Sequence, residues 1–227
     1  MTTDIPIFIL SLLPGIAWLF FYLQEDCHPE PKWLLFLVFC GGIISALVAL
    51  VAQDTLGPWL EQRSIMPYSP SSLTILAAIE ELAKFLLVWL IIHKNREFDE
   101  PIDAMVYMVV AALGFATLEN LGAVMQKDGS GFVELGTAVE TTSLRMVGAT
   151  LLHTLTSGLI GYYWATAIRE FNANRYLLAG VALAIILHAF FNYLIISYGE
   201  LSYALLFVVI VGFFILSDFE KLREKTV

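Results

Sequence analysis

Seven long apolar stretches, separated by short polar segments, set the pattern of this chain. Each approaches the roughly 20 predominantly apolar residues that a helix needs to cross a bilayer. They cover residues 5–23, 33–52, 73–92, 102–125, 146–168, 176–197 and 201–216. The pattern predicts an all-α fold, a polytopic transmembrane helix bundle with about seven spans. Because no long polar segment interrupts the series, we expect residues 1–227 to form a single membrane-embedded domain.

The composition supports an integral membrane protein and excludes one class of partner. Hydrophobic residues make up 59% of the chain and charged residues 15%, against about 25% charged in an average soluble domain. The formal net charge is -9, but several acidic residues lie in short loops or inside apolar stretches, so this charge identifies no partner. The chain has no basic face, and we therefore expect it to bind no nucleic acid.

The basic residues of the connecting segments predict an orientation, since lysine and arginine favour the cytoplasmic side. With seven spans, one side holds Lys32, Lys94, Arg96, Arg169, Arg175, Lys221, Arg223 and Lys225. The other side holds only Arg63, Lys127 and Arg145. We therefore expect an extracytoplasmic N-terminus and a cytoplasmic C-terminus.

Two segments on the outer side connect the predicted spans. Residues 53–72 contain Pro58 and are expected to form a connection. Residues 134–145 form either a short interfacial helix or an extension of the fifth span.

Three ionised residues interrupt the third apolar stretch. They are Glu80, Glu81 and Lys84, and each charge at a bilayer centre costs roughly 2.5 to 3.5 kcal/mol on insertion scales. At helical spacing Lys84 reaches either carboxylate, at i,i+4 or i,i+3. The simplest interpretation is that Lys84 neutralises a buried acid. The functional interpretation is that Lys84 supports one ionised glutamate while the other exchanges protons with water, and the spacing does not decide which glutamate does so.

Three further helices carry polar groups at a similar depth. With a rise of 1.5 Å per residue, Glu119 and His153 lie roughly 10 Å below the outer ends of their spans, and His188 lies roughly 15 Å below. Asn192 shares a face with His188 in the pattern His-x-x-x-Asn. Each of these residues alone is explained by hydrogen bonding between helices, but a common layer in the outer half of the membrane predicts one site between the helices.

Two histidines and one glutamate with a free position suit a catalytic Zn²⁺, with another glutamate as base. The usual helical His-Glu-x-x-His motif is absent from the sequence. Any metal site must therefore be assembled across helices, and the ligands predicted for it are Glu119, His153 and His188.

The order and spacing of these motifs resemble the PrsW family of membrane-embedded proteases, which is related to the CAAX prenyl endopeptidase group. The matching residues, besides the loop that contains Glu30 and Pro31, are Glu80-Glu81-x-x-Lys84, Asp103-Ala-Met-Val-Tyr107, Gly114-Phe115-x-x-x-Glu119-Asn120, His153 and His188-x-x-x-Asn192. The resemblance implies peptide-bond hydrolysis in or near the membrane. It suggests cleavage of a membrane-anchored regulator, such as an anti-sigma factor, on its extracytoplasmic side. CAAX-type relatives carry arginine and histidine where this chain has Lys84 and Glu119, which speaks against a prenylated substrate.

Together, these observations predict a membrane-embedded endopeptidase whose partners are the lipid bilayer and a membrane-anchored protein substrate. Glu80 or Glu81 would take a proton from the attacking water, with Lys84 in support. Either Glu119, His153 and His188 bind Zn²⁺, or the histidines and Asn192 stabilise the oxyanion without a metal. The alternatives are a proton-coupled transporter or channel, which also uses intramembrane Glu, Lys and His, and a catalytically silent membrane scaffold. The sequence assigns no oligomeric state.

Overall fold

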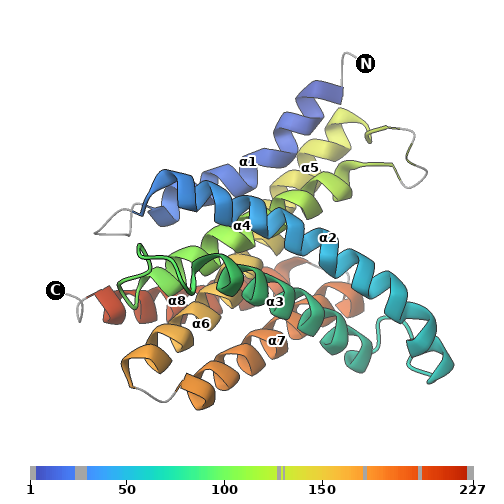
Figure 1. Ribbon diagram of the computed structural model, residues 1–227. Coiled ribbons are helices and arrows are strands. Elements are labelled where there is room, and N and C mark those ends of the chain that lie inside the picture. The colour runs from blue at the N-terminus through green and yellow to red at the C-terminus, as the bar shows by residue number, and fades with distance from the viewer. Residues whose placement is uncertain are drawn as a thin grey trace.

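The protein is a bundle of helices (Figure 1). The computed structural model describes residues 4–23, 30–126, 129, 131–170, 173–198 and 201–223, without the side chains of residues 23, 173–174, 201 and 216–223. The helices in these ranges are α1 (Asp4–Leu23), α2 (Lys32–Gln62), α3 (Pro70–Ile92), α4 (Asp103–Val124), α5 (Leu135–Val147), α6 (Ala149–Arg169), α7 (Ala173–Tyr198) and α8 (Leu201–Arg223). Beside them, the described residues form only an isolated bridge between Met125 and Phe132. The predicted all-α fold is confirmed.

Helix α4 is the centre of the bundle. It contacts α1, α2, α3, α5 and α6, and most of its residues are buried. Glycines allow its backbone to meet that of α2, since a Cβ on Gly42 would overlap the carbonyl of Ala111 and a Cβ on Gly114 would overlap the carbonyl of Phe39. Small residues at such crossings let membrane helices approach closely. The close contact fixes α4 against α2.

Four segments within the described ranges are long and apolar enough to cross a membrane: Asp4–Tyr22, Lys32–Gln62, Asp103–Val124 and Arg175–Tyr198. A shorter apolar segment covers Ser202–Ile215. The expected number of about seven spans is therefore not confirmed. Helix α3 falls outside this set and carries three ionised residues, and α6 falls outside it and contains a run of polar residues from His153 to Ser157. These two helices contact each other and bury most of those side chains.

The connection predicted over residues 53–72 is wrong for its first half. Helix α2 continues to Gln62 and contains Pro58, which leaves the carbonyl of Asp54 without its usual helical donor. The helix tolerates this because Asp54 is exposed. Helix α3 then begins at Pro70 behind Ser69, whose side chain accepts a hydrogen bond from the Ser72 amide at 3.3 Å, a typical start for a helix.

Residues 134–145 belong to a separate short helix rather than to an extension of the following span. Helix α5 ends at Val147, and Gly148 has φ -104° and ψ -95° before α6 begins. Figure 1 shows α5 beside α1, with which it is in contact. The Trp18 indole donates a 2.8 Å hydrogen bond to the carbonyl of Met146. This packing places the end of α5 next to the polar residues of α4.

Candidate functional site

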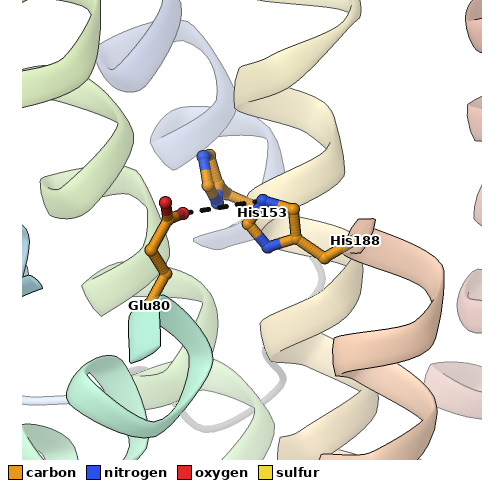
Figure 2. A group of neighbouring side chains, drawn as sticks. All are labelled: Glu80, His153 and His188. Atoms are coloured by element: carbon orange, nitrogen blue, oxygen red, sulfur yellow. Dashed lines mark ion pairs between the residues drawn. The ribbon is translucent and has the colours of Figure 1, made fainter. Parts of the chain in front are cut away.

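Polar side chains from α3, α4, α6 and α7 meet inside the bundle. Of the seven residues that the sequence singled out, six form one connected network: Glu80, Glu81, Lys84, Glu119, His153 and His188. Figure 2 shows three of them, from α3, α6 and α7, pointing toward one another. The structure thus brings these six residues together inside the bundle.

Glu81 is the fully enclosed carboxylate of the network. Its Oε1 lies 2.6 Å from the Lys84 ammonium, also accepts the Thr156 hydroxyl at 3.1 Å, and lies 2.8 Å from Nδ1 of His188. Neither Glu81 nor Lys84 has any exposed side-chain surface. Because an ionised carboxylate only accepts hydrogen bonds, Nδ1 of His188 carries the proton. Glu81 therefore fixes the ring of His188 and leaves its Nε2 as an acceptor.

Lys84 fixes the second histidine. Its ammonium lies 3.1 Å from Nδ1 of His153 and 4.8 Å from the centre of the Phe115 ring. An ammonium only donates, so Nδ1 of His153 accepts and Nε2 carries the proton. That Nε2 lies 2.8 Å from Oε2 of Glu119. Lys84 thus joins the carboxylate of α3 to the histidine of α6.

Glu119 is held from two sides. Besides His153, it accepts a hydrogen bond from Nη2 of Arg145 at 3.0 Å, and Nε of the same arginine donates to Oδ1 of Asn120 at 2.6 Å. Arg145 belongs to α5 and was missed by the sequence analysis, which treated it only as an outer-loop charge. Arg145 could have been suspected from the dipeptide Glu119-Asn120. These two residues offer hydrogen-bond acceptors, and α4 itself contains no cationic side chain to pair with them.

Glu80 lies one residue before Glu81 but has different neighbours. Its Oε1 accepts a 2.8 Å hydrogen bond from the side-chain amide of Gln53 on α2, and its Oε2 lies 3.5 Å from Nε2 of His188. Oε2 has no hydrogen-bond partner among the described residues. Since Glu81 leaves Nε2 of His188 as an acceptor, two acceptors face each other, which calls for a proton or a cation between them. Gln53 was also missed, because it fell in a predicted connection.

A cavity of about 250 Å³ adjoins this network. Glu80, Glu119 and Gln53 are the polar residues that line it. The remaining lining residues are apolar or glycine and come from α2, from α4 and from Met125 directly after α4. The side chain of Glu80 keeps 12% of its surface exposed, whereas that of Glu81 keeps none. Of the two adjacent glutamates, Glu80 is the one that faces open space.

Asn192 is the predicted site residue that no described hydrogen bond or ion pair joins to this network. It stands four residues after His188 on α7, as expected, but lines another cavity of about 250 Å³ together with Arg145, Ala149 and Phe191. It is not among the described residues around the Glu80 cavity. Arg145 is the link between the two places, because it also contacts Glu119.

Three residues of the network form a group that could hold a metal ion. Among the described residues, Glu80, His153 and His188 each offer a ligand atom, and these atoms all lie within 4.8 Å of one another. Two imidazoles and a carboxylate form a common catalytic zinc set, and the buried, unpartnered Oε2 of Glu80 agrees with it. The carboxylate in this group is Glu80 and not Glu119, which the sequence predicted. The 2.8 Å contact with Glu81 is the kind of support that orients histidine ligands.

The model of the PrsW family of intramembrane metalloproteases matches residues 30–217. The chain belongs to this family. It is therefore a membrane peptidase, and the resemblance inferred from the four motifs is confirmed.

Several relatives named Protease PrsW align with most of the chain. That of Geobacillus kaustophilus is 29% identical over 197 residues, covering 85% of this chain and 81% of the relative. That of Oceanobacillus iheyensis is 24% identical and covers 96% of both chains, and that of Bacillus subtilis is 25% identical and covers 94% of both. No solved structure was found to match the chain. The similarity thus extends over all the helices that build the network.

Proposed function

We propose that this peptidase cleaves a membrane-anchored protein with a water molecule that Glu80 activates. The observation that carries the proposal is the difference between the two adjacent glutamates. Oε2 of both residues lacks a hydrogen-bond partner among the described residues, but Glu80 lines the cavity, whereas Glu81 is enclosed and its Oε1 already faces three donors. A general base must lie within about 2.6 to 3.2 Å of the proton that it takes, and of the two adjacent glutamates Glu80 is the one that lines a cavity.

The reaction needs one proton acceptor that later becomes a donor. Oε2 of Glu80 takes a proton from the water while the water oxygen forms a bond with the carbonyl carbon of the substrate. The C–N bond then breaks, and Glu80 returns the proton to the leaving nitrogen, so that a carboxylic acid and an amine are formed. The negative charge on the former carbonyl oxygen is stabilised by N–H donors in the water-poor site, and Arg145 keeps Glu119 compensated nearby.

Glu81 and Lys84 act as positioning residues in this proposal. Glu81 holds Nδ1–H of His188, and Lys84 donates to His153, so both rings are fixed in orientation. Neither residue lines the cavity. Their loss is therefore expected to disturb the geometry of the histidines and the stability of the bundle as well as the activity.

The family description as metalloproteases is compatible with the same residues. Glu80, His153 and His188 would hold the ion, in place of the predicted set with Glu119. A bound Zn²⁺ polarises a carbonyl group and makes water a nucleophile at neutral pH. His153 would then have to release its contact with Lys84 or Glu119, since both ring nitrogens are engaged. With Glu80 as a ligand, Glu119 is the remaining cavity carboxylate that can accept a proton.

For the substrate we propose a membrane-anchored regulator, such as an anti-sigma factor, cleaved near the extracytoplasmic side. This rests on the resemblance and on the orientation with the N-terminus outside and about seven spans, which the distribution of basic residues supports. The relatives' names state only that they are proteases.

The test is cleavage of a reporter by purified protein in liposomes. The reporter has one membrane span and a different tag at each end. Glu80→Gln is expected to lower kcat by about 10² to 10⁴-fold, the usual contribution of general acid–base catalysis, without changing the unfolding transition. Glu61→Gln at the exposed end of α2 is the matched control and should be neutral. Full activity of folded Glu80→Gln would refute the assignment.

The metal is tested separately. Zinc content per mole of protein is measured in the wild type and in His188→Ala, and activity is followed after chelation and re-addition of Zn²⁺. About one zinc per wild-type molecule, lost in the variant, supports a site made of Glu80, His153 and His188. Undiminished cleavage by metal-free protein would exclude the metal and leave Glu80 as the base.

A further inference from the structure

The cavity beside Glu80 is lined mainly by apolar residues from α2 and α4. Ala46 and Ala49 form part of the wall on α2, and Leu118 and Gly122 form part of the wall on α4. The two alanines are almost completely buried, at 6% and 1% exposure. The polar members of the lining, Glu80, Glu119 and Gln53, all belong to or contact the network already described. The cavity therefore continues the proposed catalytic site into an apolar space.

The cavity opens where apolar side chains are exposed. Leu47 and Leu50 on α2 are 48% and 62% exposed, and Met125 after α4 is 44% exposed, and all three line the cavity. Because α2 is one of the segments that can span a membrane, this opening would face lipid. A segment of a membrane-anchored protein could reach Glu80 from this side without crossing the bundle.

The size and chemistry of the space suit one side chain. Pockets that bury a drug-sized ligand measure roughly 300 to 1,000 Å³, and this cavity measures about 250 Å³. An apolar group placed there gains about 25 cal/mol per Å² of buried apolar area, whereas a charged group would be desolvated beside two carboxylates. The wall thus favours a large, uncharged, apolar group.

We propose that the cavity between Ala46, Ala49 and Gly122 binds a large apolar side chain of the substrate, next to the peptide bond that Glu80 cleaves. This inference rests on the proposed function and adds its specificity. Leucine, phenylalanine or methionine beside the cleaved bond is accepted, whereas aspartate is rejected.

Gly122 is an exposed residue at the edge of the cavity. A Cβ built on it meets no described atom within 4 Å, although the residue lines the cavity. A larger side chain can therefore be added without a clash at its base, and it also removes the helix cost of glycine, about 1 kcal/mol. Gly122→Leu is accordingly a variant that occupies the space and leaves the fold intact.

Gly57 offers a matched control. It lies in helix α2, and a Cβ on it likewise meets no described atom within 4 Å. It is not among the described residues that line the cavity. Gly57→Leu therefore makes the same chemical change in a helix but should leave the specificity unaltered.

The experiment measures kcat/KM with single-span reporters whose cleavage site has first been located by mass spectrometry. The residues on either side of that bond are replaced in turn by Ala, Leu, Phe and Asp. Wild type and Gly57→Leu are expected to prefer Leu or Phe over Ala at one of the two positions by more than about tenfold, since a missing methylene group in an apolar pocket already costs about 10- to 200-fold. Gly122→Leu is expected to lose that preference while still cleaving the Ala reporter in a Glu80-dependent manner.

A second variant changes the wall of the cavity that α2 forms. Ala46→Val narrows the cavity from α2 and should reduce cleavage of the Phe reporter more than that of the Ala reporter, as Gly122→Leu does. This keeps the test decisive where Gly122→Leu yields too little folded protein.

The outcomes separate this inference from the proposed function. If cleavage depends on Glu80 and the cavity variants show the same side-chain preference as Gly57→Leu, the proposed specificity pocket is refuted and the proposed function is not. An equal loss on all reporters that varies with the acyl chain length of the liposomes shows a lipid tail in the cavity, and it overturns the pocket as well. Absence of any Glu80-dependent cleavage by the wild type overturns both proposals.

Discussion

Replacing Lys84 by methionine should destabilise the protein by about 3 kcal/mol, the lower end of the roughly 3 to 5 kcal/mol that breaking a buried ion pair costs. The pair with Glu81 is fully buried, with 2.6 Å between Nζ and Oε1. The lower end applies because the remaining carboxylate still accepts hydrogen bonds from Thr156 and His188. Methionine keeps the length of the lysine side chain, so little cavity is added.

Replacing Glu81 by methionine should cost more, about 5 kcal/mol. The ammonium of Lys84 would then be left with Nδ1 of His153 and the ring of Phe115 as its neighbours. The double variant should be more stable than either single one, because no unpaired charge remains. His188 can move its proton to Nε2, which faces Glu80 at 3.5 Å, and the Thr156 hydroxyl can donate to the carbonyl of Leu152 instead.

The assay is reversible unfolding in mixed micelles, followed by circular dichroism as the fraction of denaturing detergent increases. Leu86→Met, at a side chain 54% exposed on the same helix, is the control and should stay within about 0.5 kcal/mol of the wild type. The reasoning fails if the two single losses simply add in the double variant, since additivity indicates that the charges are not coupled.

Five further variants, at four positions, probe the packing of the bundle and the support of the site. Gly114→Ala should destabilise the bundle because its Cβ would overlap the Phe39 carbonyl, whereas Gly57→Ala should stabilise it by up to about 1 kcal/mol; the unfolding midpoints check both. Arg145→Met should lower kcat on the reporter and Arg145→Lys should recover part of it, because only arginine holds both Glu119 and Asn120; equal kcat values in the two variants would contradict this. Tyr107→Phe should cost about 2 kcal/mol, since the hydroxyl donates to the buried carboxylate of Glu30; an unchanged unfolding curve would speak against it.

The meeting of the network residues was predictable from the sequence for a simple geometric reason. A helix rises 1.5 Å per residue, so counting from the ends of apolar stretches estimates the depth of Glu119, His153 and His188. Buried polar groups at one depth are stable only if they meet. The partners within the layer were not predictable in the same way. Asn192 shares the face of His188 but lies one turn further along α7, and it lines the cavity next to Arg145 on α5, because tertiary packing decides which neighbours each turn meets.

The residues that the sequence analysis missed lie where a predicted element had the wrong end. Pro58 and the polar residues around it suggested that the second apolar stretch ended near residue 52, but α2 continues for ten further residues to Gln62. Gln53 is therefore a helical residue that donates to Glu80. Proline is costly in a helix mainly through the carbonyl that it leaves free, and at the exposed Asp54 that carbonyl is accessible. Proline does disfavour a helix interior, but the exposure of Asp54, which lowers this cost, depends on the tertiary structure and could not be predicted from the sequence.

The two adjacent glutamates show where sequence reasoning ends and structure begins. Lys84 is within helical reach of both, so spacing could not separate them. Successive residues of a helix point about 100° apart, and this turn sends Glu81 into the bundle and Glu80 toward the cavity between α2 and α4. The buried charge of Glu81 is compensated by Lys84, and it in turn holds His188 against Glu80. One glutamate can thus stabilise the arrangement in which the other remains free to react.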